Sequence, residues 1–147
     1  GGKRARILNS PDQGENWQYV ETPTMTGASA GLFSVEFIDS KKGIAVGGDF
    51  NDPARQGIRA IYTMDGGKNW HKAEGMPAAY RSCVVSPQKN LLVATGKTGC
   101  DYSTDSGRNW RYIDSLGFYA ASSVDGKPLI YLAGSQGRIA KLKISRD

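Results

Sequence analysis

Three copies of one octapeptide frame constrain this chain more than any other feature of its sequence. The frame is [ST]-x-D-x-G-x-N-W, and its copies span Ser10–Trp17, Thr63–Trp70 and Ser103–Trp110. Four matched positions, with the same Asn before Trp each time, do not recur three times by chance in 147 residues. Internal repeats of this kind indicate a fold assembled from similar units.

Each copy of the frame reads as a hairpin turn that satisfies its own polar groups. Its Asp can accept hydrogen bonds from the backbone of the turn, and its Gly supplies a positive φ. The Ser or Thr adds a second side-chain bond, and the Trp opens the next strand and buries its ring between neighbouring sheets. We therefore favour a structural role over a sialic-acid or metal site. The residues concerned are Ser10, Asp12, Gly14, Trp17, Thr63, Asp65, Gly67, Trp70, Ser103, Asp105, Gly107 and Trp110.

The segments between these turns align as four classes of short strand. The first class is 32–38, 81–86 and 118–124, and the second is 44–47, 91–95 and 129–133. The third class is 5–9, 58–63, 100–103 and 138–142, and the fourth starts at each Trp of the frame. Short β-rich runs with regular turn signals favour an all-β repeat fold. Asp65 and Asp105 are 40 residues apart, which is the size of a four-stranded β-propeller blade.

This alignment predicts about three blades in a chain that forms a single partial β-propeller over residues 1–147. We expect a half blade at 3–22, full blades at 32–73 and 80–113, and a three-stranded final blade at 118–144. Closed propellers hold roughly 4–8 blades, so the chain is expected to be the C-terminal half of a roughly six- or seven-bladed ring. Two explanations stay open: the chain is a fragment, or two copies pair as a homodimer that completes a ring.

Composition excludes several classes of protein. The longest apolar runs are only a few residues, so no transmembrane segment is expected. The net charge of +5 is accompanied by no recognition motif, so we expect no nucleic-acid partner.

Cys83 and Cys100 fall on the first and third strands of one blade. Two strand spacings, about 9.6 Å, exceed the reach of a disulfide, so both thiols are expected to be free.

With the motifs placed, the chain resembles Asp-box (BNR) β-propellers. It is most similar to the photosystem II assembly/stability-factor family and its bacterial relatives, through the phrases at 37–47, 63–70 and 133–139. The resemblance implies non-catalytic binding of a protein or peptide partner outside the cytoplasm. Similar blades occur in sialidases and xyloglucanases, so part of a glycoside hydrolase, or a carbohydrate-binding propeller, remains the alternative.

In a propeller, the loops joining fourth to first strands and second to third strands share one face, and ligands usually bind there. On that face the insert 49–56 is the longest departure from the repeat, and an added loop is a functional hint. An arginine cluster there could grip carboxylates bidentately. The candidate binding residues are Arg81, Tyr80, Arg59, Arg138, Asp49 and Asp52.

Arg81 is the strongest of these candidates, and we expect Arg81→Ala to weaken partner binding with little change in stability. Asp49 and Asp52 share one loop, where capping of its turns is the simpler role. His71 is the only histidine and shows no ligand spacing, so neither a metal nor a cofactor is expected. No phosphate loop or nucleophile elbow is present. We therefore expect no catalytic residue.

Overall fold

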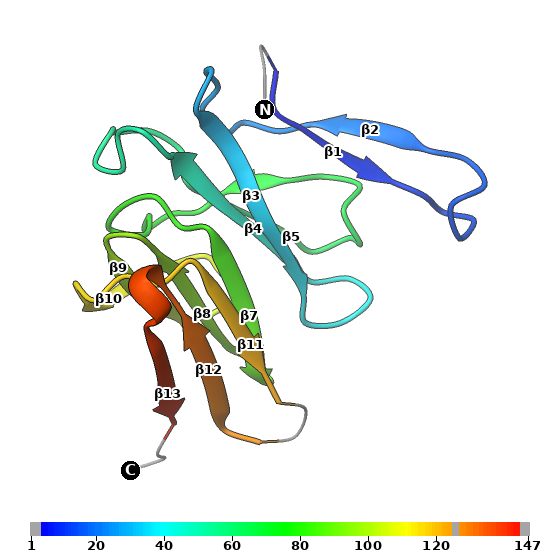
Figure 1. The fold of residues 1–147 in the computed structure, drawn as a ribbon. Coiled ribbons are helices and arrows are strands. Elements are labelled where there is room, and N and C mark those ends of the chain that lie inside the picture. The colour runs from blue at the N-terminus through cyan, green and yellow to red at the C-terminus, as the bar shows by residue number, and fades with distance from the viewer. Residues whose placement is uncertain (1–3, 125–126, 145–147) are drawn as a thin grey trace.

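The computed structural model describes residues 4–124 and 127–144 and shows an all-β chain (Figure 1). The predicted half blade starts at residue 3, which lies outside the described residues. The strands are β1 (Arg6–Asn9), β2 (Gln18–Glu21), β3 (Ala30–Phe37), β4 (Gly43–Asp49), β5 (Ala60–Thr63), β6 (His71–Lys72), β7 (Cys83–Gln88), β8 (Leu91–Gly96), β9 (Gly99–Ser103), β10 (Arg111–Asp114), β11 (Ala120–Ser123), β12 (Leu129–Ala133) and β13 (Ile139–Lys143).

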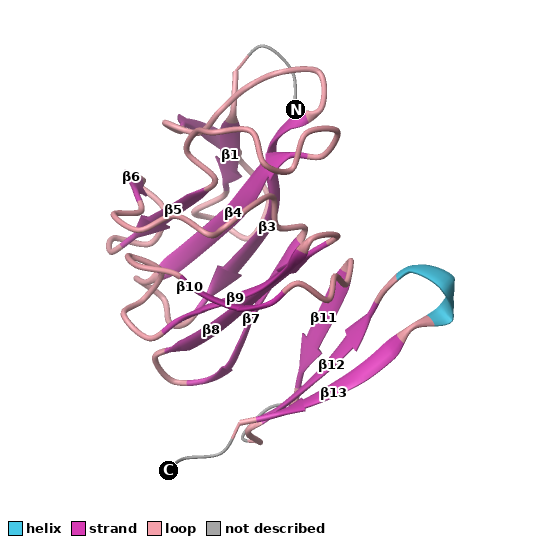
Figure 2. Ribbon diagram, turned by 90° about the vertical axis from the view of Figure 1, so that its left-hand side faces the viewer, coloured by secondary structure: helices cyan, strands magenta, loops and turns pink. Residues whose placement is uncertain are grey.

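These strands form four antiparallel sheets in chain order, and the predicted fold class is confirmed. The first sheet is β1–β2, the second β3–β6, the third β7–β10 and the fourth β11–β13. Figure 2 shows the fourth sheet set beside the third, with a single 3-10 turn, Ser135–Gly137, between β12 and β13. Among the described residues, no helix has the length and apolar character needed to cross a membrane.

The core lies between consecutive sheets, and two of the three repeat tryptophans fill it as predicted. Trp110, which precedes β10 in the third sheet, clusters with Ile44 and Val46 of β4 in the second. Trp70, which precedes β6, packs in a cluster that reaches Ile7 of the first sheet. Each of these two indole rings therefore packs against the sheet that precedes its own, and burying large apolar rings there stabilises the stack.

Trp17 is a correction to the prediction, because 62% of its surface is exposed. It belongs to the first sheet, and no sheet of the described chain precedes β1. The ring therefore lies on an open face, and the prediction that it is buried between sheets was wrong. The turn at Trp17 is built like the others, so the local motif alone did not decide burial.

Hydrogen bonds also join consecutive sheets along their first strands. Ser34 Oγ accepts from the Val84 backbone N–H at 3.1 Å, and Glu36 Oε1 accepts from the Ser86 N–H at 3.1 Å. Ser82 Oγ donates to the Tyr119 carbonyl of the following sheet at 2.7 Å. Burial at this position raises the pKa of Glu36. Backbone groups at the strand edges are thus satisfied by side chains from the neighbouring sheet.

Cys83 lies on β7 and Cys100 on β9, the first and third strands of the third sheet. Both are free cysteines, and Cys100 is buried. Burial raises the pKa of the Cys100 thiol, so it is not activated as a nucleophile.

Candidate functional site

Antiparallel order places two kinds of connection at opposite ends of each sheet. The turns that join third to fourth strands carry the octapeptide frame, and we call them the box turns: 10–17, 63–70 and 103–110. The loops that precede first strands, or join second to third strands, lie at the other end. We call residues 22–29, 50–59 and 73–82 the loop face.

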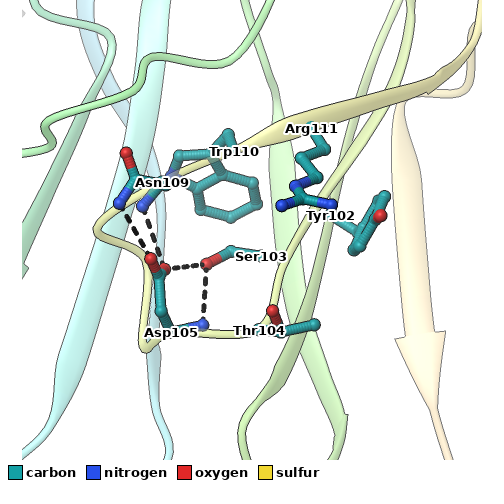
Figure 3. A pocket seen from close by; sticks show the side chains of 7 residues that line it. All are labelled: Tyr102, Ser103, Thr104, Asp105, Asn109, Trp110 and Arg111. Atoms are coloured by element: carbon teal, nitrogen blue, oxygen red, sulfur yellow. Dashed lines mark hydrogen bonds between the residues drawn. The ribbon is translucent and has the colours of Figure 1, made fainter.

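The box turn of the third sheet shows what the frame does (Figure 3). Ser103 Oγ donates to Asp105 Oδ1 at 2.9 Å and accepts from the Gly107 N–H at 3.0 Å. The two carboxylate oxygens of Asp105 accept from the backbone and the side-chain amide of Asn109, each at 2.9 Å. Trp110 Nε1 donates to the Gly107 carbonyl at 3.1 Å. The same bonds recur in the other two box turns.

A polar cavity of about 380 Å³ lies against this box turn and is also lined by Tyr102, Thr104 and Arg111. The Asp105 carboxylate in this cavity already accepts hydrogen bonds from its own turn. In the second box turn, bonds of the same type, led by that from the side-chain amide of Asn69, lower the pKa of Asp65 to about 2. In the described part of the chain, no group of His, Cys, Asp or Glu side chains is arranged to hold a metal. The geometry fits the structural role predicted for the frame.

The residue before the frame Gly also has a positive φ, which the sequence reasoning missed. Gln13 has φ 60° and Ser106 has φ 62°, while the second box turn has Gly66 at 75°. Two successive residues with positive φ are typical of a type I′ turn, which strongly favours Gly and Asn at these positions. Only the second box turn has Gly at both positions, so the other two carry a strained residue.

Arg81 belongs to the segment 73–82 of the loop face, but its side chain is buried and does not reach the surface. Its Nε donates to Asp101 Oδ2, and its Nη1 donates to the Tyr80 carbonyl at 2.9 Å. The other carboxylate oxygen of Asp101 accepts from the Ala78 N–H at 3.1 Å. The Arg81 side chain is 0% exposed, so it ties the loop before β7 to β9. This burial contradicts the expectation that Arg81→Ala would leave stability nearly unchanged.

Arg59 lies close to the Arg81–Asp101 pair, but Arg138 belongs to a different sheet. Burial, and secondarily the charge of Arg81, lower the pKa of Arg59. Arg59 Nη1 donates to the Arg55 carbonyl at 3.0 Å, while its Nε is buried with no partner. Arg138 Nη1 donates to the Gly117 carbonyl at 3.2 Å. The structure thus brings two of the predicted arginines together and not the third.

Asp49 organises the inserted loop from its first residue. Its Oδ1 accepts from Ser29 Oγ at 2.6 Å and from the backbone N–H groups of Asn51 and Asp52 at 3.0 and 3.2 Å. Its Oδ2 pairs with Arg55 Nη1 at 2.9 Å. The Ser29 bond, followed by the Arg55 bond, holds the pKa of Asp49 well below its usual range. Asp49 therefore caps the loop, and Asp52 is an exposed residue within it.

Aromatic side chains gather on the loop face around Tyr80. The Phe33 ring meets Tyr80 edge-on with centroids 4.9 Å apart, and the Phe50 ring does so at 6.0 Å. Lys97 Nζ lies 4.5 Å from the centroid of Phe50. Tyr80 itself is buried, whereas Phe33 and Phe50 are exposed. Tyr80 therefore positions two rings that solvent, or a ligand, can reach.

We call the cavity beside these rings the aromatic groove. It has a volume of about 500 Å³ and is lined by Phe33, Phe50, Asn51 and the segment 28–32. The sequence reasoning selected Tyr80 and the insert but missed Phe33, Phe50 and Lys97. The position of Phe50 in the longest insert is the signal that could have found it.

Comparison with known proteins supports the fold. No family model matches the sequence. No curated protein matches it either. A solved structure described as "YCF48 bound to D1 peptide" aligns with this chain at a TM-score of 0.66 and 19% identity. The alignment covers 95% of this chain and 44% of the other, so the chain spans less than half the length of that protein. This chain has the fold of a partial β-propeller of the YCF48 kind.

Proposed function

We propose that this chain is a non-catalytic β-propeller module that binds a protein or peptide segment through the aromatic groove on its loop face. The observation that carries the proposal is the exposed pair Phe33 and Phe50, which Tyr80 holds beside a cavity of about 500 Å³. Exposed aromatic side chains on a rigid scaffold are typical anchors of interfaces. The fold neighbour is itself a peptide complex, which agrees with this proposal.

Charge around the groove favours an acidic segment or a carboxylate as part of the ligand. Lys97 lies over Phe50 at the surface, and Arg55 is about half exposed while it pairs with Asp49. Arg59 lies beneath and adds a positive charge that forms no salt bridge with a carboxylate of the described residues. Binding outside the cytoplasm, which the family resemblance implies, belongs to the same proposal.

The acids near the loop face fit a binding role better than glycoside hydrolysis. A glycosidase needs one carboxyl group with a raised pKa to protonate the leaving group. Asp49 has a lowered pKa and accepts four hydrogen bonds, while Asp101 is buried against Arg81. Turnover of aryl glycosides by this chain, abolished by Asp52→Asn, would overturn the proposal.

Selection of peptides from a random display library on the immobilised chain tests the proposal directly. Peptides that bind should lose at least about tenfold in affinity with Phe50→Ala, because truncating an aromatic hot spot costs about 2 kcal/mol or more and about 1.4 kcal/mol is tenfold. Tyr112→Ala is the matched control, since Tyr112 is exposed to a similar degree but lies on β10, away from the groove. Selected peptides that bind both variants as tightly as the unmodified chain would exclude the aromatic groove as the site.

A further inference from the structure

Lys97 is a cation beside the aromatic groove that forms no ion pair with the described part of the chain. It lies in the two-residue turn between β8 and β9, and its Nζ is 4.5 Å from the centroid of the Phe50 ring. At this distance the ring attracts the ammonium and holds it in place. No carboxylate of the described residues lies within salt-bridge distance of Lys97. Its charge is therefore open to a ligand.

The arginines near the groove are already paired or buried. Arg55 pairs with Asp49 at 2.9 Å, and Arg81 is buried in an ion pair of its own. Arg59 is only 6% exposed and donates to the Arg55 carbonyl. Among the described cations around the groove, Lys97 is therefore the one that can pair with a ligand carboxylate without breaking an existing ion pair.

The backbone of the turn fixes where Lys97 can reach. The two glycines that flank the turn pair with each other. Thr98 Oγ1 accepts from Arg81 Nη1 at 3.4 Å, and Gly117 packs so closely on the Lys97 carbonyl that a Cβ there would clash. A turn that is fixed on both sides loses little further conformational freedom when its side chain binds a ligand.

The internal repeat shows that the fold does not need a charge in this turn. The same connection in the fourth sheet holds Ser135 and Gln136, which are uncharged, between two glycines. In the second sheet the insert 49–56 takes this place. The positive charge of Lys97 is thus a feature of the aromatic groove and is not a requirement of the blade.

We infer that Lys97 determines which class of peptide the aromatic groove accepts, an inference that rests on the function proposed above. The class is an apolar side chain that packs on Phe50, with an Asp or Glu one or two positions away in the same segment. A Lys or Arg at that position would meet a like charge and is rejected. Residues of an extended segment advance by about 3.3–3.6 Å each, so such a carboxylate can reach an ammonium 4.5 Å from the ring centroid. The pair is a charge-assisted hydrogen bond.

Charge reversal at Lys97 in the peptide-display selection tests the inference. Peptides selected on the unmodified chain should carry Asp or Glu within two positions of an aromatic or aliphatic residue. Lys97→Glu should weaken their binding at least about tenfold, because like charges then face each other. Selection repeated on this variant should enrich Lys or Arg in place of the acid. Lys97→Ala removes the ion pair alone and should weaken binding of the acidic peptides about two- to fivefold.

Lys89→Glu is the matched control for charge reversal. Lys89 is an exposed lysine in the turn between β7 and β8, at the opposite end of β8 from Lys97. The variant therefore makes the same change in net charge away from the groove. It should leave the affinity of the acidic peptides within about twofold at about 150 mM salt, where exposed charges more than about 8 Å apart are largely screened.

The outcomes separate failure of this inference from failure of the proposed function. If no selected peptide loses affinity with Phe50→Ala, the groove is not the site, and the proposed function fails together with this inference. If the peptides depend on Phe50 but carry no acid near the anchor, the groove binds peptides and Lys97 does not select them. Equal affinities for Lys97→Glu and Lys89→Glu would also overturn the inference. If Lys97→Glu does not fold, the peptide consensus and the affinities of Lys97→Ala decide the question.

Discussion

Arg81 and Asp101 form an ion pair that is almost completely removed from water, with side-chain exposures of 0% and 1%. The pair joins the loop before β7 to β9, and Arg81 also donates to the carbonyl of Tyr80, whose ring contacts Phe33 and Phe50. The rigidity of the candidate site therefore depends on a buried charge pair whose members lie 20 residues apart.

Removing one member of this pair should destabilise the chain strongly. Arg81→Met leaves the Asp101 carboxylate buried without its cation, and breaking a buried pair in this way costs about 3–5 kcal/mol. Urea unfolding followed by tryptophan fluorescence measures the loss. The double variant Arg81→Met/Asp101→Leu removes both charges and should recover much of it. A single variant as stable as the unmodified chain would mean that the pair is not formed in solution.

The three repeat tryptophans should differ sharply in their contribution to stability. Trp110→Ala removes a ring that is 7% exposed and should cost about 3–5 kcal/mol. Trp17→Ala removes a ring that is 62% exposed and should change the free energy of unfolding by less than about 1 kcal/mol. Thermal unfolding of the two variants makes the comparison. Equal losses would show that Trp17 is buried in solution.

Alanine at the frame glycines should separate backbone strain from packing. Gly14 and Gly107 both have positive φ, at 100° and 83°, so Ala is strained at either position by about 1–2 kcal/mol. A Cβ at Gly107 would also lie 2.6 Å from Ile44 Cγ1, whereas at Gly14 the nearest atom is 3.9 Å away. Gly107→Ala should therefore cost about 1–3 kcal/mol more than Gly14→Ala, as measured by urea unfolding. The reverse order would contradict the packing of this box turn on the second sheet.

Glycine should stabilise the box turns that lack it at the residue before the frame Gly. Ser106 has φ 62°, a left-handed conformation that strains a residue with a Cβ. Gly relieves this strain, and the relief exceeds the cost of the greater conformational freedom that Gly gives to the unfolded chain. Ser106→Gly should raise the free energy of unfolding by up to about 1 kcal/mol. Gly66→Ser, the reverse change at φ 75°, should lower it by at least as much, since a Cβ there would also lie 3.0 Å from the Ser40 carbonyl oxygen. Calorimetric melting temperatures test both, and a melting temperature that falls in Ser106→Gly would refute the strain argument.

Protonation of the box-turn carboxylates should weaken the fold in acid. Hydrogen bonds lower the pKa of Asp65 from 3.8 to about 2 in the folded chain. A depressed folded-state pKa gives stability that is present above about pH 3.8 and is lost as the pH falls towards about 2. The melting-temperature difference between the unmodified chain and Asp65→Asn should therefore shrink over this range. A difference that stays constant with pH would mean that the Asp65 bonds do not favour the charged form.

Local residues were enough to predict the strands. Each box turn satisfies its polar groups within eight residues, so Asp12, Asp65 and Asp105 make the same bonds wherever their sheets lie. Short apolar runs between these turns then have one favourable arrangement, the antiparallel sheet. The sequence therefore determined the all-β fold, the order of the strands and the capping role of Asp49.

Only the tertiary structure decided which of these residues meet water. Trp17 and Trp110 lie in the same frame, yet one is exposed and the other is buried, because burial depends on the sheet alongside. Arg81 is a charged residue of the kind that usually lies at the surface, where it can bind a ligand. Asp101, on another strand, pairs with it, and the pair is removed from solvent. Phe33, Phe50 and Lys97 converge on one groove from three separate segments. Their contacts arise from the stacking of the sheets, and stacking is a property that no local pattern encodes.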